Sequence, residues 1–176
     1  LVRGGRELAG PAAAGADPPL RGYRGGPLGA ADGDARAALA ACRDLPGLDL
    51  DVDRALRVWD QLVHLPQPAG APAWFHGDLL AENLLVGAGR LAGVLDLGGL
   101  GVGDPSVDLV VAWEVLGPAE RETFRDLVGV DKDTWLLGAG WALLVAALTF
   151  PYYWHTMPAR CRDRMTMARA VLQALG

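Results

Sequence analysis

The chain has 176 residues, 51% of them hydrophobic, and a formal net charge of −5 at pH 7. This size and composition predict one globular domain with its own core, and they exclude an intrinsically disordered chain. No basic stripe is present, which argues against a nucleic-acid partner. Cys42 and Cys161 lie far apart without metal-ligand spacing, and no targeting segment opens the sequence, so a cytoplasmic location is expected.

The first part of the chain is rich in Gly, Pro and Ala, and residues 1–33 are therefore expected to be irregular and loop-rich. Gly25 and Gly26 are followed by no lysine or helix start at the distance of a phosphate-binding loop. We interpret this stretch as a flexible surface connection. Helices are expected at residues 34–42 and 51–65, the second with apolar residues at helical spacing and an aspartate cap.

Residues 74–108 predict a short strand, a polar loop, a hairpin and the capped start of a helix. Asp78 lies in the polar loop. Asn83 begins the first apolar run of the hairpin and Asp96 follows the second, with a Gly-rich turn between the runs. Pairing of the two runs would make Asn83 and Asp96 neighbours.

Three side chains would then surround one small volume, and all of them offer oxygen atoms. Oxygen ligands suit Mg²⁺ rather than Zn²⁺, and Mg²⁺ usually combines one or two carboxylates with phosphate oxygens and water. Asn83 and Asp96 fit the role of magnesium ligands. Asp78 is left to accept a hydrogen bond from a hydroxyl and to aim it at phosphorus, as phosphoryl transfer requires.

The same residues carry a family resemblance. His76-Gly77-Asp78, four further residues and Asn83 match the kinase pattern H-x-D-x-x-x-x-N, and Asp96-Leu97-Gly98 stands where kinases have Asp-Phe-Gly. With the Gly-Asp-Pro-x-x-Asp-Leu segment that ends at residue 109, the series resembles the aminoglycoside phosphotransferase family of small-molecule kinases.

The resemblance implies an α+β, mainly helical fold, the C-terminal lobe of a protein-kinase-like fold with a small β-hairpin carrying the catalytic loop. It implies Asp78 as catalytic base, and Asn83 and Asp96 as ligands of the Mg²⁺ that binds with ATP. His76 and Asp108 would support the catalytic loop.

Simpler interpretations remain open for several of these residues. Asn83 and Asp96 also fit plain turn positions, and Asp108 suits the dipole at a helix start. Asp104, followed by proline, fits a helix N-cap. His76 is interpreted as structural, holding the loop by a ring hydrogen bond, rather than as the base itself.

Four helices are expected after this region, at residues 105–116, 118–128, within 134–158 and at 158–175. Residues 134–158 lack charge, but glycines and Pro151 interrupt the run, so a buried helix is expected rather than a membrane span. Acidic residues, Glu114 among them, are expected on a solvated face or, alternatively, around a polyamine-like substrate. Arg164 is expected on the solvent side of the last helix. The expected core residues are Trp59, Trp74, Phe75, Leu84, Leu95, Leu109, Trp113, Trp141 and Leu144.

One expected part of a kinase is missing from the sequence. Kinases of this kind hold the nucleotide phosphates with a lysine in an N-terminal lobe of strands, but the only lysine here, Lys132, follows the Asp96 motif. Residues 1–176 are therefore interpreted as one C-terminal catalytic lobe without its nucleotide lobe, as a fragment or truncated form. An exposed apolar surface is expected where that lobe, or a second copy of the chain, would dock.

Two functions of different classes follow. The first is ATP-dependent transfer of the γ-phosphoryl group to a hydroxyl of a small molecule that is aminoglycoside-, macrolide- or amino-alcohol-like, with antibiotic resistance as the implied context. The alternative is a non-catalytic, kinase-like module that binds a small molecule or a protein.

Overall fold

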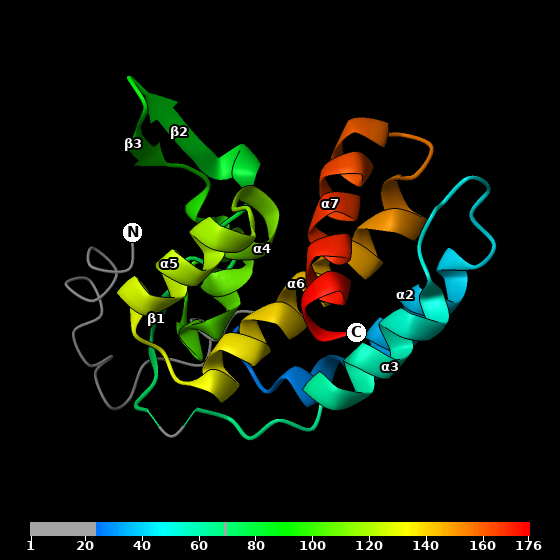
Figure 1. Ribbon diagram of the computed structural model, residues 1–176, viewed down its shortest axis with the longest axis horizontal. Coiled ribbons are helices and arrows are strands. Elements are labelled where there is room, and N and C mark those ends of the chain that lie inside the picture. Colours follow the sequence, from blue (N-terminus) through cyan, green and yellow to red (C-terminus); the bar gives the residue numbers. More distant parts are fainter. Residues whose placement is uncertain (1–23, 69) are drawn as a thin grey trace.

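The computed structural model describes residues 24–68 and 70–176, which form an α+β, mainly helical fold (Figure 1). The expected fold class is confirmed, whereas the expectations for residues 1–23 lie outside the described residues. The helices are α2 (Asp32–Cys42), α3 (Val52–Leu62), α4 (Val110–Val115), α5 (Pro118–Val128), α6 (Lys132–Tyr153) and α7 (Pro158–Leu175). The strands are β1 (Ala73–Phe75), β2 (Leu84–Gly87), β3 (Arg90–Val94) and β4 (Gly101–Gly103).

The central element is α6, which packs against α2, α3, α4 and α7. Asp131 caps its start by accepting a hydrogen bond from the backbone N–H of Thr134 at 2.8 Å. By length and composition α6 could cross a membrane, but 78% of its most apolar stretch is buried inside the protein. It is the buried core helix that the sequence predicts.

Pro151 lies inside α6, close to its C-terminal end. Proline has no N–H to donate to the carbonyl four residues earlier, which belongs to Ala147. The Cys42 thiol faces that carbonyl, with 4.0 Å between sulfur and oxygen. Burial raises the pKa of Cys42 to about 11, so the thiol keeps its proton and remains a donor at neutral pH.

Helices α2 and α3 form a layer on α6, and both begin near where the sequence predicts. Asp51 caps α3 by accepting from the backbone N–H of Arg54 at 2.9 Å. The indole N–H of Trp59 on α3 donates to Asp32 on α2 at 2.7 Å. This bond joins the two helices while the Trp59 ring is fully buried.

Two antiparallel strand pairs position the polar loop. Strand β1 pairs with β4, and β2 pairs with β3 as the expected hairpin, which projects from the helical body in Figure 1. Ala88 and Gly89 have φ angles of 49° and 71°, which matches a tight hairpin turn at the predicted place. Strand β4 is a finding that the glycine-rich sequence does not predict.

The core contains most of the expected residues. The buried ones are Trp59, Phe75, Leu109, Trp113, Trp141 and Leu144. Trp74 and Leu84 are half-buried, and Leu95 is wrong as a core residue, with 46% of its surface exposed. The backbone of Leu95 bonds to Asn83 and His76 at the base of the hairpin, while its side chain is exposed. Six large apolar residues on the hairpin and just after it are exposed and are here called the hairpin surface: Leu85, Val86, Leu91, Leu95, Leu97 and Leu100. Docking of a missing lobe on an apolar surface stays a prediction.

Candidate active site

The polar loop at residues 76–83, here called the HGD loop, is hydrogen-bonded to the side chain of Asp108. One Asp108 carboxylate oxygen accepts from the backbone N–H of His76 at 2.7 Å, and the other from that of Gly77 at 2.9 Å. Burial raises the pKa of Asp108, while these two N–H groups act in the opposite direction. Asp108 therefore fixes the loop backbone directly, which the helix-dipole interpretation does not describe.

The His76 ring ties the HGD loop to the end of β3. Its Nδ1 atom accepts a hydrogen bond from the backbone N–H of Asp78, with 3.2 Å between the nitrogens. Because Nδ1 accepts, the proton lies on Nε2, which donates to the Leu95 carbonyl at 2.8 Å. Both ring nitrogens are occupied by backbone groups, an arrangement that fits a structural histidine.

Gly77 lets the loop pass close to the turn after Asp96. Its φ angle is 80°, a conformation that favours glycine, and a Cβ atom there would lie 2.3 Å from the Gly99 carbonyl oxygen. No other residue type fits this crossing without backbone movement.

Hydrogen bonds to Asp78 orient the side-chain amide of Asn83. The Asn83 side-chain nitrogen donates to the Asp78 carbonyl oxygen at 2.8 Å and lies 3.3 Å from the Asp78 carboxylate oxygen Oδ2. Both partners are acceptors, so the amide nitrogen must face Asp78 and the amide oxygen is directed elsewhere. That oxygen is the atom of Asn83 that suits a hard cation.

The hairpin brings Asp96 to the same place. The backbone N–H of Leu95 donates to the Asn83 carbonyl at 2.8 Å, so the residue that follows Leu95 starts beside the HGD loop. Asp96 has a left-handed backbone, with φ 56° and ψ 73°, and it is exposed. One of its carboxylate oxygens accepts from the Gly98 N–H at 3.2 Å. A non-glycine residue in this conformation stores about 1 kcal/mol of strain, which is typical of functional sites.

The assignment of Asn83 and Asp96 as magnesium ligands stays a prediction. Within residues 24–68 and 70–176, no three His, Cys, Asp or Glu side chains are grouped to hold a metal ion. Asn83 and Asp96 offer only oxygen atoms, so a cation here needs further oxygens from a phosphate or from water. This is the coordination that Mg²⁺ has with nucleotides.

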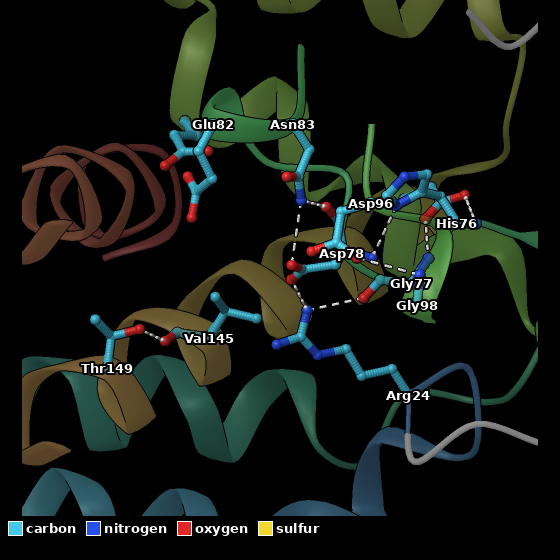
Figure 2. Close-up of polar contacts among 12 residues, drawn as sticks. Arg24, His76, Gly77, Asp78, Glu82, Asn83, Asp96, Gly98, Val145 and Thr149 are labelled. Atoms are coloured by element: carbon cyan, nitrogen blue, oxygen red, sulfur yellow. Dashed lines mark hydrogen bonds and ion pairs between the residues drawn. The ribbon is translucent and has the colours of Figure 1, made fainter. Parts of the chain in front are cut away.

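Arg24 is a site residue that the sequence interpretation missed. Its guanidinium Nη1 donates to the Gly77 carbonyl at 2.8 Å and forms an ion pair with Asp78 Oδ1. Figure 2 shows Arg24 and Asn83 reaching Asp78 from two sides. The expected flexible surface connection is wrong for this part of the chain, because Arg24 and Gly25 are packed against the HGD loop and Phe75.

A buried ion pair supports the other end of the loop. Glu114 on α4 accepts from the backbone N–H of Ala81 at 2.7 Å and pairs with Arg164 on α7, which also pairs with Glu82 at 2.6 Å. The expected solvent exposure of Arg164 and Glu114 is wrong, since both side chains are 2% exposed. Burial raises the pKa of Glu114, against the opposing effects of the Ala81 N–H and Arg164.

Comparison with known proteins identifies the family of this chain. The model of the family described as "Phosphotransferase enzyme family" matches residues 6–142. The chain belongs to this family. Among curated relatives, an aminoglycoside 3'-phosphotransferase from Escherichia coli is 36% identical over 84 residues, which are 46% of this chain and 31% of the relative. One from Salmonella typhimurium is 30% identical over 79 residues, or 43% of this chain and 29% of the relative.

These matches cover about a third of the relatives' own length. Among solved structures, the ADP-bound aminoglycoside phosphotransferase APH(2'')-Ib is similar with a TM-score of 0.42 and 15% identity. The match covers 81% of this chain and 52% of that one. The family that the HGD, Asp-Leu-Gly and Gly-Asp-Pro motifs indicate is confirmed. Phosphoryl transfer is therefore the reaction to test.

Proposed function

We propose that this chain carries the catalytic residues of an ATP-dependent phosphotransferase, which moves the γ-phosphoryl group to a hydroxyl of a small molecule. Asp78 is the proposed base, Asn83 and Asp96 are the proposed Mg²⁺ ligands, and Asp108 and His76 hold the loop. The observation that carries the proposal is the convergence of Asn83 and the end of the hairpin on Asp78, on a loop fixed by Asp108.

In the proposed reaction, one bond to phosphorus forms, one breaks and one proton moves to Asp78. The acceptor oxygen forms a bond to the γ-phosphorus as the bond between that phosphorus and the β,γ-bridging oxygen breaks, with its electron pair leaving on ADP. The hydroxyl proton passes to Asp78. Bound Mg²⁺ would neutralise phosphate charge, and the chain's own contribution is to position the hydroxyl and the phosphates.

The acceptor class comes from the relatives and from the charge of the chain. The curated relatives are named for aminoglycosides, and this chain has a net charge of −5, which suits a cationic acceptor. We propose an aminoglycoside-, macrolide- or amino-alcohol-like acceptor, a cytoplasmic location and a role in antibiotic resistance. Growth of a susceptible bacterium that expresses the protein, with and without each antibiotic, tests the last point.

The first test is calorimetric titration of ATP into the chain, with and without Mg²⁺, alongside the Asp96→Ala variant. Binding that needs both Mg²⁺ and Asp96 would support a working metal–phosphate site, and an ADP-release assay with candidate acceptors then tests transfer. Arg90→Ala is the matched control, because Arg90 lies at the exposed far end of the hairpin. Folded protein that binds no nucleotide would show that this chain is not a kinase by itself.

The hairpin surface is the proposed docking place for a nucleotide-binding lobe or for a second copy of this chain. Its six large apolar residues are exposed, from 43% at Leu91 to 71% at Val86. Sedimentation of the chain at increasing concentration, beside Val86→Glu, tests the second possibility. Self-association that the variant does not weaken would place the contact elsewhere.

A further inference from the structure

The contact between Arg24 and Asp78 assigns a role to a residue that lies outside the kinase motifs. We propose that Arg24 is a positioning residue for the base: it holds Asp78 by Oδ1, so that the acceptor hydroxyl approaches through Oδ2. This inference rests on the proposed function, because it names which oxygen of Asp78 takes the proton.

The occupancy of the two carboxylate oxygens supports the assignment. Oδ1 is paired with the Arg24 guanidinium, whose side chain is only 17% exposed, and the same Nη1 atom also holds the Gly77 carbonyl at 2.8 Å. Among residues 24–68 and 70–176, the one polar contact of Oδ2 is the long 3.3 Å contact to the Asn83 amide nitrogen. Oδ2 is therefore the oxygen with room for a hydroxyl donor, and it lies on the side of the proposed metal ligand, where a phosphoryl group would arrive.

The backbone next to Arg24 is tightly packed against β4 and Phe75. The N–H of Asp104 donates to the Gly25 carbonyl at 2.8 Å, which fixes the segment beside β4. Gly25 has a φ angle of 78°, and a Cβ atom there would lie 2.2 Å from the ring of Phe75. A Cβ atom on Gly103 would lie 2.4 Å from the Gly25 carbonyl oxygen. These close contacts restrict the backbone next to Arg24. The guanidinium is therefore held in one orientation toward Asp78.

Leu28 anchors the other end of the same segment in the core. It is 1% exposed, and it packs on Gly140 of α6, where an added Cβ atom would lie 2.3 Å from a Leu28 methyl carbon. The segment that carries Arg24 is thus fixed to β4 and to α6. A charged side chain held on such a support meets the requirement for orienting a catalytic group, where a displacement of about 1 Å lowers rates roughly a hundredfold.

A double-mutant cycle tests whether Arg24 holds Asp78, and it needs no activity. The urea midpoint is measured for the unaltered chain, Arg24→Gln, Asp78→Ala and the double variant. We expect Arg24→Gln to lower the midpoint at least about twice as much in the unaltered chain as in the Asp78→Ala background. Equal effects in both backgrounds would overturn the proposal. Arg36→Gln is the matched control, because Arg36 pairs with Asp32 and Asp60 on the distant α2–α3 layer.

Kinetics test the positioning itself. We expect Arg24→Gln to lower kcat about tenfold or more with little change in the KM for ATP, and Arg24→Lys to restore part of the loss. Arg36→Gln should keep the kcat of the unaltered chain. Unchanged kcat in a folded Arg24→Gln protein would overturn the proposal even if the stability cycle shows coupling. If the unaltered chain transfers no phosphoryl group, the proposed function fails, and the cycle alone decides whether Arg24 holds Asp78.

Discussion

Arg164 on α7 and Glu114 on α4 form an ion pair in which both side chains are 2% exposed. Glu114 uses its other oxygen to bind the backbone N–H of Ala81, in the HGD loop. The pair therefore connects the C-terminal helix to the loop that carries Asp78. A buried pair of this kind contributes little net stability, but removing one partner leaves an uncompensated charge.

Arg164→Met should destabilise the protein strongly, because Glu114 would remain buried without its cation. We expect the free energy of unfolding to fall by about 3 kcal/mol or more, as measured by urea denaturation. Adding Glu114→Gln to Arg164→Met should recover part of the loss, since glutamine carries no charge and can still accept from Ala81. Arg169→Ala is the control, because Arg169 and its partner Asp49 are 50% and 91% exposed. If the free energy of unfolding falls by about 1 kcal/mol or less in both arginine variants, the Arg164–Glu114 pair behaves energetically like a solvent-exposed ion pair.

Gly25 and Gly47 make a matched pair of glycines, because both have a φ angle of 78°. Nothing lies within 4 Å of a Cβ atom added at Gly47, whereas one added at Gly25 would overlap the Phe75 ring. Gly47→Ala should therefore show only the backbone penalty of about 1 kcal/mol, and Gly25→Ala should lose at least about 1 kcal/mol more. Thermal unfolding of the two variants measures the difference. Equal losses would show that the Phe75 ring moves aside freely.

Asp108→Asn should change how stability depends on pH. Burial raises the pKa of Asp108 in the folded chain above the ordinary value of 3.8. The folded state then binds the proton more tightly than the unfolded state, so the Asp108 contribution to stability is fully present below pH 3.8 and falls as the pH rises through the raised pKa. Asparagine does not titrate. The stability advantage of the unaltered chain over Asp108→Asn should therefore shrink as the pH rises above 3.8, measured by urea denaturation at a series of pH values.

The opposite trend has a clear meaning. If the advantage over Asp108→Asn grows as the pH rises, the hydrogen bonds from His76 and Gly77 outweigh the burial of the carboxylate. The pKa of Asp108 would then be lowered rather than raised. Asp163→Asn is a suitable control, because Asp163 is exposed on α7.

Asp78→Asn should separate the proposed chemistry from nucleotide binding. Asparagine keeps the shape of the side chain but cannot accept the hydroxyl proton, so kcat should fall by about 10²- to 10⁴-fold. The affinity for ATP with Mg²⁺, measured by calorimetry, should stay within about threefold of the unaltered value. A folded variant with normal kcat would remove Asp78 from the role of base.

Local signals in the sequence were sufficient for several elements. Helix α5 occupies Pro118–Val128 as predicted, because proline at its start and Gly129, with a φ of 65° at its end, are signals within the segment itself. The proximity of Asn83 to the residues around Asp96 also follows locally, since one tight turn closes the hairpin between them. The motif order alone indicates the family, while the catalytic roles of these residues stay predictions.

Contacts between distant segments were decided only by the tertiary structure. Arg24 lies 54 positions before Asp78, in a Gly-rich stretch without any periodic pattern, and its position depends on packing against Phe75 and β4. Arg164 lies on the side of α7 that packs against α6 and α4, and Glu114 on α4 pairs with its charge there. Charge alone predicts exposure for such residues. A buried partner reverses that prediction, and the identity of the partner is fixed only when the chain folds.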